Sequence, residues 1–163
     1  MMFSPDLLAR AEKLLASSRL QGLRIATAES CTGGLIAALL TEIAGSSDVF
    51  GRGFVTYSDK AKEDMLGVPS ALLRQHGAVS EAVARAMAQG AVRNSTAQLS
   101  VAVTGIAGPG GGSEEKPVGL VHIAAARAGG PTLHRELRLG DIGRSNVRLK
   151  TVEAALEMLE QLL

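Results

Sequence analysis

Apolar residues recur at helical spacing in several segments of the chain. Residues 4–18 place Leu7, Ala11 and Leu14 on one face, and Ser4-Pro5 provides a typical helix start. Similar spacing, together with serine caps and closing glycines, predicts further helices. These cover residues 32–43, 58–67, 69–75, 80–94 and 144–162.

Short apolar runs between these segments indicate β-strands. The expected strands cover residues 23–28, 53–57, 99–104, 118–126 and 132–139. Strands alternate with helices in the first half of the chain, and neighbouring strands follow in the second half. This order predicts an α/β protein, with a single-domain α/β/α layered fold over residues 1–163 and a mixed β-sheet.

Composition narrows the classes of function. Of the 163 residues, 46% are hydrophobic and only 2% aromatic, which predicts an aliphatic core. The 17 basic and 16 acidic residues nearly cancel, without the basic stripe of a nucleic-acid binder. No apolar run is long enough to span a membrane, and charges between Met1 and Leu20 argue against a signal peptide. The single cysteine, Cys31, excludes an internal disulfide. We therefore expect a cytoplasmic domain that acts on a small molecule.

A first candidate loop, residues 27–34, lies between a strand and a helix and reads Thr-Ala-Glu-Ser-Cys-Thr-Gly-Gly. Backbone N–H groups at a helix N-terminus can hold a phosphate or stabilise an oxyanion. Ser30 stands where a nucleophile would be placed. For this loop taken alone, helix capping is the more ordinary explanation, because Ser and Thr before a helix usually serve only as caps.

A second candidate loop, residues 104–113, follows a strand directly and is rich in glycine. Pro109 and the strand expected from Val118 leave no helix for a dinucleotide fingerprint, and no Gly-Lys-Ser/Thr follows to make a Walker loop. A flexible hairpin linker is one interpretation. A ligand-binding loop is the other, since α/β folds bind ligands at the carboxyl ends of strands.

Between the two loops, the only tyrosine of the chain, Tyr57, precedes a helix that bears Lys60 and Lys62. These lysines lie about 200° apart around a helix and cannot face one site together. A solvated surface charge is the ordinary role of a lysine. A buried lysine with a lowered pKa can instead deprotonate a serine.

Several long motifs occur in an order that resembles the CinA C-terminal family. They are the 27–34 motif, Gly-Phe-Val-Thr-Tyr-Ser at 53–58, His-Gly-Ala-Val-Ser at 76–80, the 104–112 loop, and Glu-Lys-Pro-Val-Gly at 115–119. The resemblance extends from about Leu7 to Leu159. It implies the family fold and the activity of the characterised members, which are nicotinamide-nucleotide amidohydrolases. Some members carry an additional N-terminal domain similar to molybdopterin-binding proteins, so this chain is expected to be the stand-alone form.

The resemblance implies a serine–lysine hydrolase. The family nucleophile corresponds to Ser30, and the family lysine, five residues after the tyrosine, corresponds to Lys62. Tyr57 matches a tyrosine that forms hydrogen bonds in the site. The expected substrate-binding residues are Thr32, Gly33 and Gly34 in the first loop and Thr104, Gly105, Ala107 and Gly108 in the second.

Two arginines near the C-terminus are candidates for contact with the phosphate of the substrate. Family members carry Gly-Asp-Arg and then a further arginine on the last helix. Here Gly140-Asp141 is followed by Arg144 and Arg148, so the spacing differs by about two residues. We expect the phosphate contact from Arg144 first and from Arg148 second. Asp59 stands where many members have Asn.

The expected reaction is hydrolysis of the carboxamide of nicotinamide mononucleotide to nicotinate mononucleotide and ammonia. Lys62 takes the proton of Ser30, and N–H groups of residues 30–34 stabilise the oxyanion. We expect no metal and no cofactor, because the three histidines are scattered, and His122 fits a core position. We expect no nucleic-acid and no membrane partner, and homo-oligomer formation stays open.

Two rival interpretations remain at this point. Cys31 could be the nucleophile, as a thiolate at a helix N-terminus, although adjacent residues rarely point the same way. The domain could also be a non-catalytic nucleotide-binding or competence- and damage-related interaction module. Release of ammonia by the purified protein separates this second interpretation from an amidohydrolase.

Overall fold

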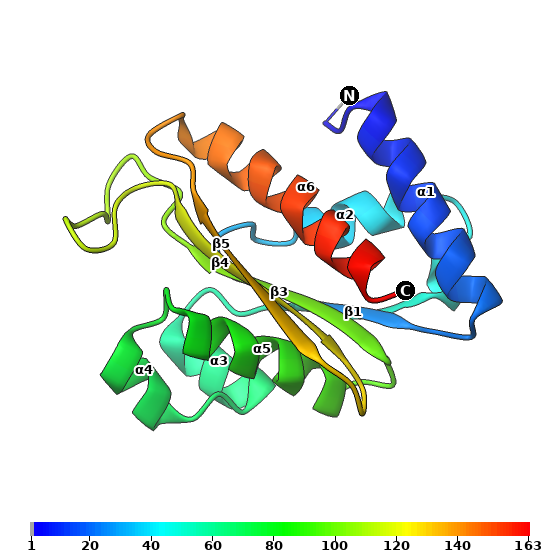
Figure 1. Ribbon diagram of the computed structural model, residues 1–163, viewed down its shortest axis with the longest axis horizontal. Coiled ribbons are helices and arrows are strands. Elements are labelled where there is room, and N and C mark those ends of the chain that lie inside the picture. Colours follow the sequence, from blue (N-terminus) through cyan, green and yellow to red (C-terminus); the bar gives the residue numbers. More distant parts are fainter. Residues whose placement is uncertain (1) are drawn as a thin grey trace.

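A five-stranded mixed sheet lies at the centre of the computed structural model, which describes residues 2–163 (Figure 1). The strands are β1 (Ile25–Glu29), β2 (Phe50–Val55), β3 (Leu99–Gly105), β4 (Leu120–Arg127) and β5 (Thr132–Arg138). Their order is β2-β1-β3-β4-β5. Strand β1 pairs in parallel with β2 and β3, whereas the β3–β4 and β4–β5 pairs are antiparallel. The predicted α/β class with a mixed sheet is confirmed.

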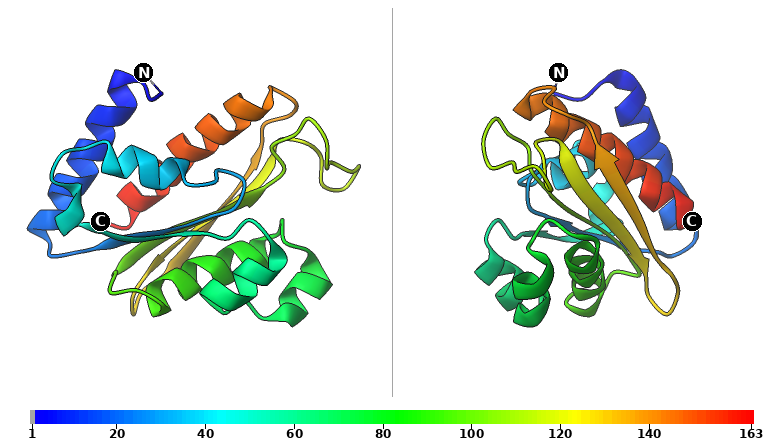
Figure 2. Two further views of the ribbon diagram at one scale, coloured as in Figure 1. Left: turned by 180° about the vertical axis from the view of Figure 1, so that it is seen from behind. Right: turned by 60° about the vertical axis from the view of Figure 1, so that its left-hand side comes forward.

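Helices cover both faces of this sheet. They are α1 (Pro5–Leu20), α2 (Leu35–Thr41), α3 (Asp59–Leu66), α4 (Ser70–His76), α5 (Glu81–Arg93) and α6 (Arg144–Gln161), with a short 3₁₀ helix η1 (Ser46–Asp48). Helices α1, α2 and α6 lie on one face, and α3, α4 and α5 lie on the other (Figure 2). The predicted α/β/α layering is therefore confirmed.

The two faces of the sheet pack differently. Against α1, α2 and α6 the core is built from large aliphatic side chains, which include Leu14, Ile36, Ile123 and Leu156. Against α5 the sheet presents mainly alanines, which allow a close approach of the helix. Gly90 continues this trend, because a side chain there would collide with the backbone of Leu66 at the end of α3. This close contact fixes α3, and with it Lys62, against α5.

Two predicted elements differ in extent from the observed ones. The helix expected over 32–43 begins only at Leu35 and ends at Thr41, because Gly33 and Gly34 have φ values of 57° and 108° and form a turn. The strand expected over 53–57 is β2, Phe50–Val55. The strand pairs with β1 from Phe50 onward. Its start is not evident from the sequence, because the Gly-Arg-Gly stretch that follows Phe50 shows no alternation of apolar and polar residues.

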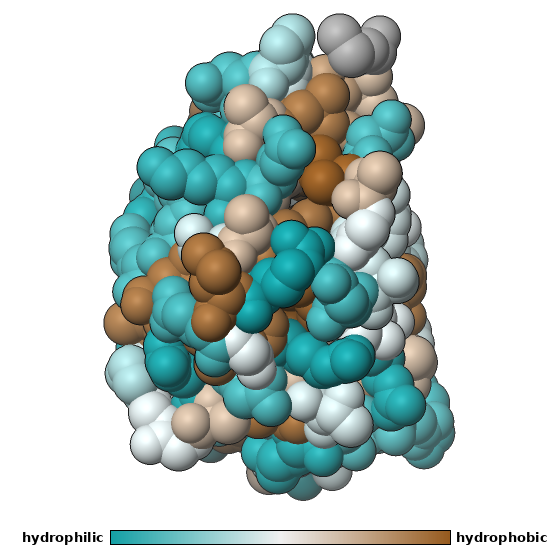
Figure 3. Space-filling view, turned by 90° about the vertical axis from the view of Figure 1, so that its right-hand side faces the viewer, coloured by the Kyte–Doolittle hydropathy of each residue, from teal (hydrophilic) through white to brown (hydrophobic). Residues whose placement is uncertain are grey.

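The surface beside α1 is mostly hydrophilic, with a band of apolar residues through its middle (Figure 3). Leu20 at the end of α1 is among the apolar side chains exposed in the protein. Within residues 2–163, no helix is both long enough and apolar enough to cross a membrane.

Candidate active site

The nucleophile candidate lies at the edge of the sheet where the parallel strands β1, β2 and β3 all end. Ser30 follows the last residue of β1, and its N–H donates to the carbonyl of Val103 on β3 at 3.0 Å. Its own carbonyl accepts from the N–H of Gly33 at 3.0 Å, which closes a tight turn before α2. Because parallel strands point the same way, the segments after β2 and β3 reach the same place.

Lys62 meets Ser30 at this edge. The Nζ atom of Lys62 lies 3.1 Å from Oγ of Ser30 and donates to the carbonyl of Thr56 at 3.0 Å. Helix α3 starts at a Ser58 cap, whose Oγ accepts from the N–H of Ala61. This start turns Lys62 inward, so that the residue is only 2% exposed.

The two lysines of α3 have different environments. Burial lowers the pKa of Lys62, against smaller opposing effects of Asp59 and Cys31. Lys60 points to solvent and pairs with Asp64 at 3.0 Å, and this hydrogen bond raises the pKa of Lys60. A desolvated amine whose pKa is lowered can carry a free lone pair toward the serine, whereas Lys60 cannot reach it.

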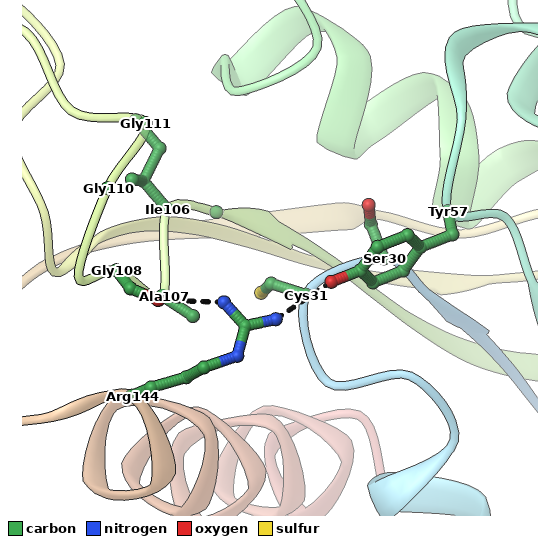
Figure 4. A pocket seen from close by; sticks show the side chains of 10 residues that line it. Ser30, Cys31, Tyr57, Ile106, Ala107, Gly108, Gly110, Gly111 and Arg144 are labelled. Carbon is green, nitrogen blue, oxygen red and sulfur yellow. Dashed lines mark hydrogen bonds between the residues drawn. The ribbon is translucent and has the colours of Figure 1, made fainter.

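Cys31 does not share the geometry of its neighbour. Burial raises the pKa of the Cys31 thiol to about 11, so the thiol is protonated near neutral pH. Its Sγ and the Oγ of Ser30 point in different directions (Figure 4). A thiolate nucleophile at this position is therefore disfavoured on both counts.

A pocket of about 260 Å³ opens in front of Ser30. Its lining consists of Ser30, Cys31, Tyr57, Gly105, Ile106, Ala107, Gly108, Gly110, Gly111 and Arg144. Arg144, from the first turn of α6, crosses this pocket and donates to the carbonyl of Gly108 at 2.8 Å and to Oη of Tyr57 at 2.9 Å (Figure 4). The guanidinium thus joins the glycine-rich loop after β3 to the tyrosine after β2.

The amide groups of the turn are not equally available to a ligand. Those of Ser30 and Gly33 already donate within the protein. Among residues 2–163, the N–H groups of Cys31, Thr32 and Gly34 donate to no carbonyl or carboxylate, and of these three residues only Cys31 lines the pocket. The donor available beside the nucleophile is therefore the amide that follows Ser30, a narrower set than the 30–34 turn that the sequence suggested.

Five residues expected to bind substrate lie outside this pocket lining. Thr32 is buried, and its hydroxyl donates to Glu29 at 2.6 Å. Gly33 and Gly34 form the turn behind the nucleophile. The hydroxyl of Thr104 donates to the carbonyl of Ala78 at 3.0 Å, since that threonine side chain turns into the interface with the α4–α5 connection.

Arg148 is the fifth of these residues, and it also turns away from the pocket. It donates from Nε to the carbonyl of Cys31 at 3.1 Å and from Nη2 to that of Thr32 at 3.0 Å. Its fork is thus occupied by the backbone of the nucleophile turn, whereas Arg144, one helical turn earlier, faces the pocket. The phosphate contact expected from Arg148 does not fit this placement.

Sequence reasoning missed several contributors. Ile106, Gly110 and Gly111 line the pocket and lie inside the second loop, so the loop motif marked them collectively. The carbonyl of Thr56 that holds Lys62 left no signal, because any residue has a carbonyl. Over the part of the chain that the structure describes, no group of three or more His, Cys, Asp or Glu side chains could hold a metal ion.

Together these features define a class: an α/β domain with a buried serine–lysine pair facing a pocket at the carboxyl ends of parallel strands. The chain belongs to the CinA C-terminal domain family, whose family model matches residues 8–163.

Curated relatives share this domain. The chain is 54% identical over 136 residues to a CinA-like protein from Akkermansia muciniphila, which covers 83% of this chain and 33% of that protein. It is 53% identical over 145 residues to a CinA-like protein from Mycobacterium sp. (strain JLS), with 88% and 34% covered. The chain thus spans about a third of the length of these relatives.

Solved structures share the whole fold. The competence/damage inducible protein CihA from Agrobacterium tumefaciens matches with a TM-score of 0.96 at 57% identity, covering 98% of this chain and 97% of that one. A CinA superfamily protein from Escherichia coli matches with a TM-score of 0.91 at 34% identity, covering 99% and 94%. The layered fold and the mixed sheet are therefore those of the family.

Proposed function

We propose that this domain is an amidohydrolase that converts nicotinamide mononucleotide to nicotinate mononucleotide and ammonia. The observation that carries the proposal is the 3.1 Å approach of the buried Lys62 amine to the Ser30 hydroxyl in front of a pocket. A lysine with a pKa lowered by burial, next to a serine that lines a pocket, is the arrangement that serine acylation needs. The resemblance to nicotinamide-nucleotide amidohydrolases supplies the substrate.

Acylation begins with the neutral amine of Lys62. One of its N–H groups donates to the carbonyl of Thr56, which leaves the lone pair free to accept the proton of the Ser30 hydroxyl. The Ser30 oxygen then bonds to the carboxamide carbon, and the carbonyl oxygen becomes an oxyanion. The N–H of Cys31, next to the nucleophile, donates to this oxyanion.

Collapse of the tetrahedral intermediate breaks the C–N bond. The Lys62 ammonium returns its proton to the leaving nitrogen, which departs as ammonia and leaves an ester on Ser30. Water then attacks the ester with Lys62 again as the base, and the carboxylate product leaves while the Ser30 hydroxyl is restored. The same base and the same donor serve both halves of the reaction.

Arg144 is the phosphate ligand in this proposal. Its guanidinium lines the pocket, and two of its five N–H groups are used by Gly108 and Tyr57, so the others remain to donate to a phosphate. The net charge of the chain is only +1, so local groups have to bind the phosphate in the absence of a general basic field. The glycine-rich loop from Gly105 to Gly108 provides the facing wall.

The test is ammonia release from nicotinamide mononucleotide by the purified protein, with Ser30→Ala and Cys31→Ala as a matched pair. Ser30→Ala should abolish release with the fold intact by circular dichroism, while Cys31→Ala should keep most of the rate. Nucleotide binding without ammonia release would instead establish a non-catalytic module. Loss of activity confined to Cys31→Ala would restore the thiol mechanism.

A further inference from the structure

The turn that carries Ser30 is held from two sides by charged side chains. On one side is Glu29, which is 1% exposed and accepts hydrogen bonds from the Thr32 hydroxyl and from the N–H groups of Ile36 and Ala37. This carboxylate fixes the start of α2. On the other side is Arg148 from α6, which binds the carbonyls of Cys31 and Thr32.

The contact of Arg148 reaches Ser30 through a single peptide group. The carbonyl of Thr32 accepts from Arg148 Nη2 at 3.0 Å, and the N–H of the same Thr32–Gly33 peptide donates to the carbonyl of Ser30 at 3.0 Å. A peptide group is planar and rigid, so orienting its carbonyl also orients its N–H. The guanidinium therefore sets the position of the nucleophile's own backbone.

The second contact acts on the preceding peptide group of the turn, one residue closer to the nucleophile. Arg148 Nε holds the carbonyl of Cys31 at 3.1 Å, which orients the Cys31–Thr32 peptide in the same way. The turn otherwise depends on Gly33 and Gly34, both at positive φ, where the backbone has wide conformational freedom. A planar fork that spans two successive carbonyls restrains this freedom as a single ammonium cannot.

We propose that Arg148 is a positioning residue that holds the Ser30 turn in the geometry needed for attack, and that it makes no contact with substrate. The role rests on the proposed function, in which Ser30 is the nucleophile. It also separates the two arginines of α6. Arg144 is one of the residues lining the pocket, whereas the guanidinium of Arg148 donates to the backbone carbonyls of Cys31 and Thr32.

The experiment compares Arg148→Ala and Arg148→Lys with Lys150→Ala. Lys150 lies on the same helix, is exposed, and pairs with Glu153, so its variant controls for removing a positive charge from α6. Steady-state kinetics are measured with nicotinamide mononucleotide and with nicotinamide riboside, which lacks the phosphate. Ser30 reactivity is measured separately as the rate of covalent labelling by an alkyl fluorophosphonate.

Arg148→Ala should lower kcat about 100-fold, the size of effect that follows from misplacing a reacting group by about 1 Å. KM should stay nearly unchanged, the loss should be equal on the two substrates, and labelling should slow in parallel. Arg148→Lys keeps the charge and the aliphatic stem but not the fork, so it should recover little of the rate. If Arg148→Ala unfolds at a lower temperature than the assay allows, Arg148→Lys still tests the role of the fork.

Two results overturn the positioning role: a loss confined to the KM of nicotinamide mononucleotide, which indicates phosphate binding, or labelling at the wild-type rate in both variants. A wild-type protein that releases no ammonia refutes the proposed function instead. The labelling comparison still decides the role of Arg148 in that case, because it needs no turnover of the nucleotide.

Discussion

Two regions of the molecule hold buried or half-buried basic side chains whose pKa values are lowered by desolvation, and only the first of them lies at the pocket in front of Ser30. In the first, Lys62 lies against the Ser30 hydroxyl. In the second, His122 on β4 and His134 on β5 stack with ring centroids 5.2 Å apart, and Nδ1 of His122 lies 2.9 Å from Nε2 of His134.

The two regions also differ in the groups that surround the basic side chains. Each histidine has a carboxylate nearby, Glu136 at 3.7 Å from His122 and Glu81 at 3.5 Å from His134. The partners of the Lys62 amine are a hydroxyl and a carbonyl. A lowered pKa alone therefore does not mark a catalytic group: it does so where a nucleophile and a pocket share the site.

The largest effect is expected from the lysine itself. Lys62→Ala should lower kcat by at least about 10²- to 10⁴-fold, the usual contribution of a general base. Lys60→Ala, on the same helix, should be close to neutral, because Lys60 is exposed and pairs only with Asp64. Ammonia release by the two variants checks the assignment. Equal losses in both would show that the register of α3 relative to Ser30 is misjudged.

The pH dependence of kcat/KM is the next sharpest test. Turnover needs the neutral amine, so the rate should rise with pH through the pKa of Lys62, which burial places below the ordinary value of 10.5. The profile is measured with nicotinamide mononucleotide under conditions in which the protein stays folded. A rate that falls as the pH rises through this range would mean that the charged form of Lys62 is the active one.

Arg144 should give a smaller effect that depends on the substrate. Of the two arginines on α6, only Arg144 is among the residues that line this pocket. A hydrogen bond to a charged group contributes about 1.5–3 kcal/mol. Arg144→Ala should therefore weaken nicotinamide mononucleotide about 10- to 100-fold in kcat/KM while sparing nicotinamide riboside. Equal losses on both substrates would assign Arg144 to the structure of the pocket, through its bonds to Gly108 and Tyr57.

The local parts of this picture could be read from sequence. The strand-to-helix turn marks Ser30, and helix geometry allows only one of Lys60 and Lys62 to face it, whereas the choice of Lys62 comes from the family motif. Helix and strand order, and hence the layers, depend on periodicity along the chain, which the sequence displays directly. The start of α2 was misplaced because positive φ at both Gly33 and Gly34 is a property of the folded turn.

Long-range contacts could not be read in this way. Arg144 and Arg148 are one helical turn apart, and no pattern along the chain predicts that Arg148 meets the backbone of Cys31 and Thr32. That outcome depends on how α6 crosses the end of β1. Thr104 is similar, because the carbonyl of Ala78 that takes up its hydroxyl lies 26 residues away in the chain.

The histidine pair should give the smallest effect, and on stability instead of turnover. Burial is the main cause that lowers the pKa of both imidazoles below 6.5. His134 and Lys116 lower the pKa of His122 further and Arg85 that of His134, while Glu81 and Glu136 oppose the shift at both histidines. The folded protein therefore binds protons less readily than the unfolded chain. The contribution of the pair is fully present above about pH 6.5 and is lost as the pH falls toward the folded pKa values.

Replacing one member of the pair tests this linkage. His134→Gln removes a titrating group, so its free energy of unfolding should fall less steeply between pH 7 and pH 5 than that of the wild type, by at most about 1.4 kcal/mol per pH unit. Urea unfolding at several pH values measures the slope, and the exposed His76→Gln provides the matched control. Ammonia release should be unchanged in both variants, because neither histidine lines the pocket. A large loss of turnover in His134→Gln would contradict this prediction. It would mean that the histidine pair contributes to the active site, and that its two carboxylate neighbours do not give it a purely structural role.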